Sequence, residues 1–298
     1  MYWNINGTCR KGGDYVGAIA ERQLCCGSGL SGLVFYTAIA AIHRACVMTL
    51  AHLISDIDGW IYFSYPMILM PRNKNSSESG DRLSVREQVY QNGFAFLRGL
   101  SPQTPTFDVA SLLGEPCQLG RDEMVQPLIP LPLSAPNTYS GNYGLDRFPF
   151  HTDLAHWSLP PRYFMLRCIK GYAQVPTLVF DGNNLVSIVG REILRRAVVR
   201  PRRPTAGKVR LLRLLGEGPD AEILRWDSLY LKPASPIGEL AFAKLHECLS
   251  SIKPHTVALV EEGDTMIIDN WRMLHGRAAV MERYRDRHLE RVYLGSLN

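Results

Sequence analysis

Two imidazoles and one carboxylate stand in this chain at positions where they could hold a redox metal. His151 and Asp153 are separated by one residue, and His275 lies far downstream in the run 269–277. In an extended chain residues i and i+2 point to the same face, so His151 and Asp153 can converge on one ion. Two neutral nitrogens and one hard oxygen suit Fe(II) and leave adjacent coordination positions open for a chelating cosubstrate and dioxygen. The residue types therefore indicate oxidative chemistry at a metal.

The same spacing occurs a second time, at His288 and Glu290. A pair of this kind arises easily by chance, and its ordinary interpretation is a strand residue hydrogen-bonded to a neighbour. The second pair lies inside the alternating run 287–294, whereas the first follows Phe148-Pro149-Phe150 and precedes a polar and aromatic run. The context favours the first pair as the one at a strand end that opens into a pocket, although spacing alone leaves the metal and structural interpretations open.

Two stretches of the sequence resemble the Fe(II)/2-oxoglutarate-dependent dioxygenases, in the subgroup that contains taurine dioxygenase, γ-butyrobetaine hydroxylase and clavaminate synthase. The first stretch is 150–184, with Gln174-Val175-Pro176-Thr177-Leu178 inside it, and the second runs through 269–277 to 287–290. Two motifs in the right order are more specific than either alone. Weaker similarity upstream extends the resemblance to about residues 81–298. We therefore expect 81–298 to form a dioxygenase domain and 1–80 to be an atypical N-terminal segment that packs on it.

The resemblance implies roles for five residues. His151, Asp153 and His275 would ligate Fe(II), and Arg287 and Thr177 would bind the distal carboxylate of the cosubstrate 2-oxoglutarate. A guanidinium suits that task because it pairs bidentately with a carboxylate and keeps its proton. Thr177 on its own is interpreted as no more than a β-forming residue.

Three further residues are candidates for substrate binding. Arg291 matches the position that contacts the anionic group of the substrate in taurine dioxygenase, and in a strand it would share a face with Arg287. The alternative for Arg291 is a solvated surface arginine. Trp157 and Asn142 lie close in sequence to the metal ligands, and polar and aromatic groups on loops are typical of small-ligand pockets.

The activity implied by the resemblance is hydroxylation of an unactivated carbon of a free amino acid or a related small carboxylate. Dioxygen and 2-oxoglutarate would be consumed, and succinate and CO2 released. Related halogenases replace the acidic ligand by a small residue, so the presence of Asp153 favours hydroxylation. Desaturation and cyclisation begin with the same hydrogen abstraction and stay open. A non-catalytic barrel with a structural metal is disfavoured, because Arg287 and Thr177 accompany the three ligands.

To position these residues, the resemblance implies an α+β fold, a double-stranded β-helix (jelly-roll) barrel with flanking helices. Short strand-like runs bounded by turn residues support it: 162–168, 208–215, 222–231, 256–260 and 265–269. A helix should begin after the N-cap Ser235, with Pro236 in its first turn, and run to Leu249. A second helix is expected over 184–197.

Composition indicates a soluble enzyme: the chain has 298 residues, 46% hydrophobic and 20% charged, which is enough for one large core. Seven cysteines without a Cys-x-x-Cys motif indicate a reducing compartment, and the start of the chain shows no secretory signal, so a cytoplasmic location is expected. The apolar run 32–54 is interrupted by His43-Arg44, so we expect a buried helix packed on the barrel or on a second subunit, and no membrane span.

Arginines cluster between residues 191 and 213, and a basic patch of this kind can bind nucleic acid. No aromatic stacking platform is interleaved with these arginines, which favours a solvated helix end and loop. A small molecule and dioxygen are therefore the expected partners, with a nucleic-acid-binding protein as the alternative and a homo-oligomer possible.

Overall fold

The computed structural model describes residues 83–120, 122–132, 138–204 and 208–298. They belong to the second of the two units into which the chain divides, 78–298, and this unit is described by itself. The segment 1–80, with its expected helix and its predicted packing on the barrel, lies outside the described residues.

Two antiparallel sheets form the centre of this unit. The larger has the order β1-β13-β5-β15-β2, with β3 also paired to β15. Its strands are β1 (Phe94–Leu97), β13 (Thr265–Asp269), β5 (Tyr163–Lys170), β15 (His288–Leu297), β2 (Gly114–Pro116) and β3 (Gln126–Leu128). The second sheet has the order β12-β6-β14-β4, with strands β12 (His255–Val257), β6 (Thr177–Asp181), β14 (Met273–Arg277) and β4 (Phe148–His151).

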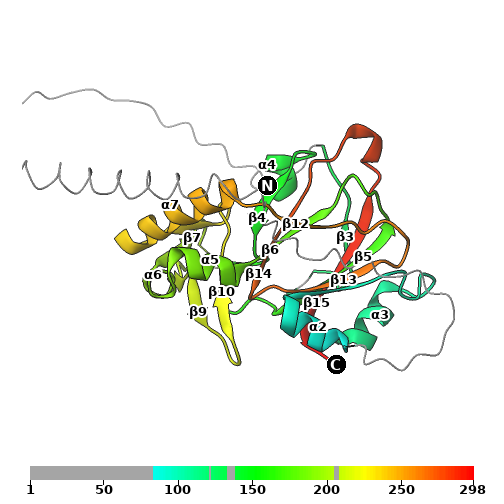
Figure 1. Ribbon diagram of the computed structural model, residues 1–298, viewed down its shortest axis with the longest axis horizontal. Coiled ribbons are helices and arrows are strands. Elements are labelled where there is room, and N and C mark those ends of the chain that lie inside the picture. The colour runs from blue at the N-terminus through cyan, green and yellow to red at the C-terminus, as the bar shows by residue number, and fades with distance from the viewer. Residues whose placement is uncertain (1–82, 121, 133–137, 205–207) are drawn as a thin grey trace, which may run out of the picture. The chain divides into compact units, whose positions relative to one another are not determined.

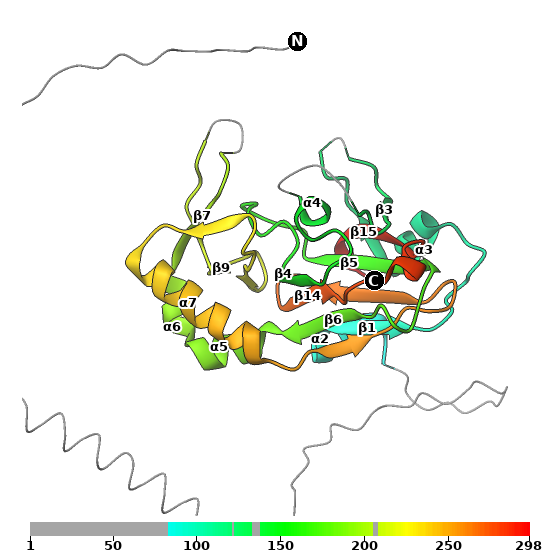
Figure 2. The same cartoon turned by 90° about the horizontal axis from the view of Figure 1, so that it is seen from above.

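Smaller antiparallel sheets lie beside the second sheet (Figures 1 and 2). One has the order β11-β7-β8 and the other pairs β10 with β9. Their strands are β11 (Leu231–Pro233), β7 (Val198–Pro201), β8 (Leu212–Arg213), β10 (Glu222–Leu224) and β9 (Leu215–Glu217). The mixture of helices and antiparallel sheets confirms the α+β class predicted from the sequence.

Strand β5 shows why the larger sheet is apolar on both faces. Phe164 and Leu166 are buried in a cluster that also contains Val179 of β6 and Met273 of β14, so residues of both main sheets share one core. Met165, which points the other way, is buried against residues of helices α2 and α3. A strand covered on both faces is expected to be continuously hydrophobic rather than alternating.

Seven helical segments are found in the described part of the chain: α2 (Val85–Asn92), α3 (Thr106–Leu113), α4 (Tyr139–Tyr143), α5 (Gly182–Val189), α6 (Arg191–Arg196), α7 (Pro236–Ser251) and the 3-10 turn η1 (Glu282–Tyr284). Helices α5, α6 and α7 gather beside the smaller sheets (Figures 1 and 2). None of the helices found there is long and apolar enough to cross a membrane.

The two predicted helices differ in outcome. Helix α7 begins as predicted, because the Ser235 hydroxyl accepts a hydrogen bond from the Gly238 N–H at 3.0 Å and Pro236 occupies the first turn. The helix predicted over 184–197 is instead two helices. Gly190 separates them with a φ of 99°, a conformation that interrupts a right-handed helix and that glycine adopts without steric cost.

Candidate metal centre and pocket

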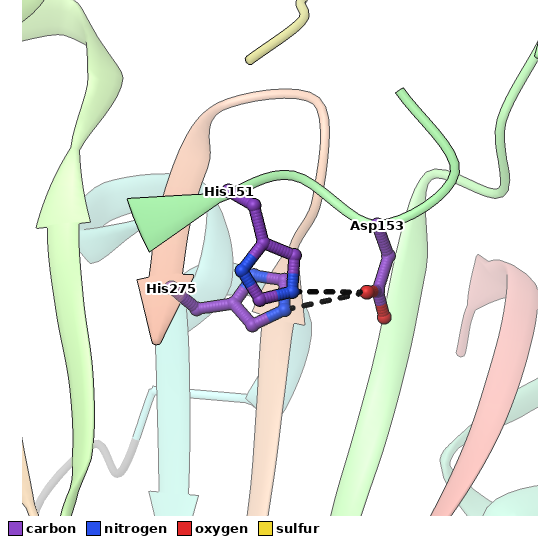
Figure 3. A group of neighbouring side chains, drawn as sticks. All are labelled: His151, Asp153 and His275. Carbon is purple, nitrogen blue, oxygen red and sulfur yellow. Dashed lines mark ion pairs between the residues drawn. The ribbon is translucent and has the colours of Figure 1, made fainter. Parts of the chain in front are cut away.

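The fold brings the predicted metal ligands together. His151 at the end of β4 and His275 in β14 are cross-strand partners, and their ring centroids are 4.4 Å apart. Asp153 follows the end of β4, and its Oδ1 lies 3.6 Å from Nε2 of His151 and 3.5 Å from Nε2 of His275 (Figure 3). One donor atom from each residue lies within 4.8 Å of the others, and all three residues are buried. These distances are at or beyond the limit of a hydrogen bond, but they suit ligand atoms that bind the same metal ion.

The protonation of the three side chains fits a divalent cation. Nδ1 of His151 lies 2.9 Å from the carbonyl oxygen of Pro149, so Nδ1 carries a proton that it donates to this carbonyl. Nε2 is then the ring nitrogen that would bind a metal, an arrangement typical of metal-ligating histidine. Burial and the neighbouring His151 lower the pKa of His275 to about 4, so this ring is neutral at pH 7. Burial alone would raise the pKa of Asp153, but Arg291 and His275 bring it well below its usual range. Burial alone would lower the pKa of His151, but Asp153 raises it above its usual value, so a cation bound here would displace a proton from this ring and leave two neutral imidazoles and one carboxylate facing one point.

The backbone of Asp153 is fixed by Asn270, which precedes β14. The side-chain oxygen of Asn270 accepts the Asp153 N–H at 2.7 Å, and its amide group donates to the carbonyls of Asp153 and Pro161, each at 3.0 Å. The next residue, Leu154, has a φ of 54°, which turns the chain sharply after the ligand. The buried carboxylate is thus held by a residue far away in sequence.

The outer oxygen of Asp153 has partners of its own. Oδ2 accepts hydrogen bonds from Nη1 of Arg291 at 2.7 Å and from the hydroxyl of Tyr293 at 2.9 Å. Arg291 is anchored in turn on Oε1 of Gln126, to which its Nη2 donates at 2.7 Å. The carboxylate therefore presents Oδ1 to the imidazoles. Arg291 points inward as its predicted substrate role requires, but its guanidinium is engaged with the metal ligand.

A cavity of about 420 Å³ lies against the three ligands. Arg287 and alternate residues of β15 line it, namely Leu289, Arg291 and Tyr293, as the two-residue repeat of a strand requires. His288 and Glu290 lie on the other face, and Glu290 accepts a hydrogen bond from Thr106. The rival pair thus points away from the metal ligands, and Arg287 and Thr177 both reach their cavity.

Arg287 is a buried cation for which no acidic partner is found among the described residues. It is 4% exposed, burial lowers its pKa to about 10, and its Nε has no hydrogen-bond partner among the described residues. A charge buried in this way is costly unless an anion pairs with it. The position next to the metal ligands therefore suits the carboxylate of a bound small molecule.

Sequence reasoning missed four residues that line the cavity: Arg277, Asp227, Tyr230 and Tyr293. Arg277 and Tyr293 each stand two positions after a predicted site residue on the same strand, so strand periodicity could have identified them. Asp227 and Tyr230 lie in an irregular segment with no such signal. Burial raises the pKa of Asp227, whose Oδ1 accepts the backbone N–H groups of Leu229 and Tyr230, each at 2.8 Å.

Trp157 and Asn142 are not brought to the metal ligands. Trp157 lies 36% exposed in a separate open cavity of about 1050 Å³. The side-chain amide of Asn142 donates to the carbonyl of Thr138 at 2.7 Å within α4, and Asn142 does not line the ligand cavity. Helix α4 contributes Tyr139 instead, whose ring stacks on His151 with centroids 4.2 Å apart.

Sequence comparison agrees with this arrangement. Residues 189–293 match the family described as taurine catabolism dioxygenase TauD, TfdA family. This segment is TauD-like. It contains His275 and Arg287, while His151 and Asp153 lie upstream of it. The chain is also 27% identical over 161 residues to clavaminate synthase 2 of Streptomyces clavuligerus, which covers 49% of this chain and 49% of that protein. The chain thus matches about half the length of this curated relative, and the resemblance predicted from the two motifs is confirmed.

Solved structures share the fold. The non-haem iron oxygenase OrfP in complex with Fe and α-ketoglutaric acid has a TM-score of 0.56 at 22% identity, covering 71% of this chain and 79% of that chain. An asparagine oxygenase in complex with Fe(II), hydroxyasparagine and succinate has a TM-score of 0.54 at 20% identity, covering 70% and 76%. PvcB of Pseudomonas aeruginosa has a TM-score of 0.51 at 21% identity, covering 69% and 77%.

Proposed function

We propose that this protein is an Fe(II)- and 2-oxoglutarate-dependent dioxygenase that hydroxylates an unactivated carbon of a free amino acid or a related small carboxylate. The observation that carries the proposal is the joint presence, in one cavity, of His151, Asp153 and His275 with the buried Arg287, whose Nε has no partner in the described part of the chain. The likeness to clavaminate synthase 2 and to the TauD, TfdA family supports it.

The proposal gives the site residues two roles, metal binding and cosubstrate binding. His151, Asp153 and His275 would hold Fe(II), which supplies the redox chemistry when bound with the cosubstrate and dioxygen. Arg287 and Thr177 would bind the distal carboxylate of 2-oxoglutarate. One oxygen atom of dioxygen would enter the product as a hydroxyl and the other would enter succinate, with loss of CO2.

An amine and a carboxylate on the substrate would each find a partner in the cavity. Asp227 is 2% exposed and faces the cavity beside His156 and Tyr230, so it could pair with a substrate ammonium group. Arg291 lines the same cavity and could share its guanidinium between Asp153 and a substrate anion. An amino acid carries both charges. The asparagine oxygenase whose structure is similar holds a hydroxylated amino acid, in agreement with this choice.

We further infer that the two main sheets form the walls of a double-stranded β-helix. The support is the core they share and the fold likeness to OrfP and to the asparagine oxygenase. Residues 81–298 would then be the dioxygenase domain. Desaturation or cyclisation by the same site is compatible with the residues present.

Several of the arginines behind the nucleic-acid alternative are engaged in contacts within the protein. Arg191 and Arg195 both form ion pairs with Glu222, and Arg213 donates to the carbonyl of Arg195 at 2.6 Å. Paired surface charges of this kind are ordinary features of a solvated helix end. We therefore advance the small-molecule enzyme alone.

Anaerobic spectroscopy tests the proposal. Protein given Fe(II) and then 2-oxoglutarate should develop a visible charge-transfer absorption, and Arg287→Gln should weaken cosubstrate binding while leaving Fe(II) binding intact. A screen of amino acids and small carboxylates for stimulated succinate release then finds the substrate. Absence of both the absorption and succinate release in the wild type would contradict the proposal.

A further inference from the structure

The end of the cavity that holds Arg287 contains a second arginine. Arg277 lies in β14 of the four-stranded sheet, and Arg287 immediately precedes β15 of the six-stranded sheet. Both line the ligand cavity, so the two guanidinium groups reach it from different sheets. Arg277 is also the cross-strand partner of Thr177, which places it beside the hydroxyl expected to bind the cosubstrate.

The two arginines bring two positive charges to this end of the cavity, and among the described residues Asp146 is the only carboxylate that acts on either of them as a counter-charge. Nε of each arginine is buried and lacks a hydrogen-bond partner among the described residues. Two like charges in a partly desolvated space repel each other, and an anion between them removes both the repulsion and the unmet donors.

Contacts with the 144–148 segment fix the Arg277 side chain at this end of the cavity. Its guanidinium stacks on the ring of Phe148, 3.9 Å from the centroid, and its Nη2 donates to the carbonyls of Gly144 at 2.8 Å and Asp146 at 2.7 Å. These contacts use one nitrogen and one face of the group. The Nε–H has no partner among the described residues, so the five-donor fork of this guanidinium keeps a donor that these contacts do not use.

We propose that Arg277 is a further cosubstrate-binding residue, which donates with Arg287 and Thr177 to the distal carboxylate of 2-oxoglutarate. The inference rests on the proposed function. A carboxylate has two oxygens with about four acceptor sites, so it can accept from two guanidinium groups and one hydroxyl together. The second guanidinium would favour a 2-oxo acid that ends in a carboxylate over one of equal length that ends in a methyl group.

The test compares two 2-oxo acids on Fe(II)-loaded protein by anaerobic titration calorimetry. The first is 2-oxoglutarate and the second is 2-oxopentanoate, which keeps the metal-chelating end and replaces the distal carboxylate by methyl. Arg277→Gln should raise the Kd of 2-oxoglutarate on the order of tenfold or more, the usual effect of losing a charge-assisted hydrogen bond. The Kd of 2-oxopentanoate should stay the same.

The control is Arg285→Gln, which removes the same charge from an exposed arginine paired with Glu282. It should change neither Kd. The double variant of Arg277 and Arg287 should lose less affinity than the two single losses combined, because both groups act on one carboxylate.

Other outcomes overturn the inference. An unchanged Kd for 2-oxoglutarate, or an equal loss for both 2-oxo acids, would make Arg277 a structural support for the 144–146 loop. If Arg277→Gln melts below the assay temperature, Arg277→Lys replaces it, with the same selective loss for 2-oxoglutarate expected from the loss of the fork. Failure of the wild type to bind Fe(II) or 2-oxoglutarate would instead refute the proposed function.

Discussion

Asn270 offers the sharpest test of how the metal ligand is positioned. Asn270→Ala would remove all three side-chain hydrogen bonds that join Asp153 and Pro161 to the strand end before β14. Asn270 is 1% exposed, so the abandoned backbone groups would have little access to water. At about 1 kcal/mol for each buried hydrogen bond, the variant should lose about 3 kcal/mol of unfolding free energy. Because Asp153 would no longer be held in position, the Kd of Fe(II) should also rise on the order of tenfold or more.

Urea unfolding followed by tryptophan fluorescence measures the first quantity in metal-free protein, and anaerobic calorimetry with Fe(II) measures the second. Asn183→Ala is the matched control, because Asn183 is exposed at the start of α5 and should cost under about 0.5 kcal/mol. An Asn270→Ala protein within about 1 kcal/mol of wild type, with unchanged Fe(II) affinity, would refute the argument that Asn270 holds the carboxylate.

Three other predictions concern His275, Arg225 and Asp227. In metal-free protein the lowered pKa of His275, about 4 against an ordinary 6.5, stabilises the fold above pH 6.5, and this contribution is lost as the pH falls toward 4. His275→Gln should therefore lose less stability than wild type over that interval in urea titrations at several pH values; equal slopes would count against a buried neutral imidazole. Arg225→Met removes three hydrogen bonds to the carbonyls of Ala155, Trp157 and Ser158, and should cost about 3 kcal/mol by urea unfolding. The control Arg196→Met, at an exposed arginine, should cost under about 0.5 kcal/mol. Similar losses of unfolding free energy in the two variants would refute a stabilising role for the Arg225 hydrogen bonds. Asp227→Asn should raise the KM for an amine-bearing substrate on the order of tenfold in steady-state assays without changing the Kd of 2-oxoglutarate, whereas an unchanged KM would remove Asp227 from substrate recognition.

The residues on strands were the predictable part of the site. The i, i+2 spacing placed His151 and Asp153 together, and the alternation that joins Arg287 to Arg291 holds along β15. Both rest on the fixed geometry of an extended chain. The pairing of β4 with β14 was not predicted; the family resemblance indicated only that His275, from a later strand, would join His151 and Asp153.

Residues near a ligand in sequence were less predictable. Trp157 follows Asp153 by four positions, but the left-handed Leu154 and the hydrogen bond from the Trp157 N–H to the Leu154 carbonyl, 2.8 Å, turn the chain away from the cavity. Asp227 enters the cavity from a loop whose conformation depends on tertiary contacts. The Thr152 N–H donates to the Trp226 carbonyl, and the Thr152 hydroxyl accepts from the Trp226 N–H. The break at Gly190 likewise depends on a backbone conformation that an apolar repeat does not encode.

Strand β4 is an edge strand of its sheet, since among the described residues it pairs only with β14, and the pairing is irregular between His275 and Arg277. An edge strand opens at a lower free energy than a central strand, because fewer hydrogen bonds must be broken. One of the candidate metal ligands, His151, therefore lies on an edge strand, and its partner His275 lies on a central strand. An ion bound by both histidines would link β4 to β14 and raise the free energy needed to open this edge. The backbone amides of β4 should therefore exchange with solvent deuterium more slowly once Fe(II) is added.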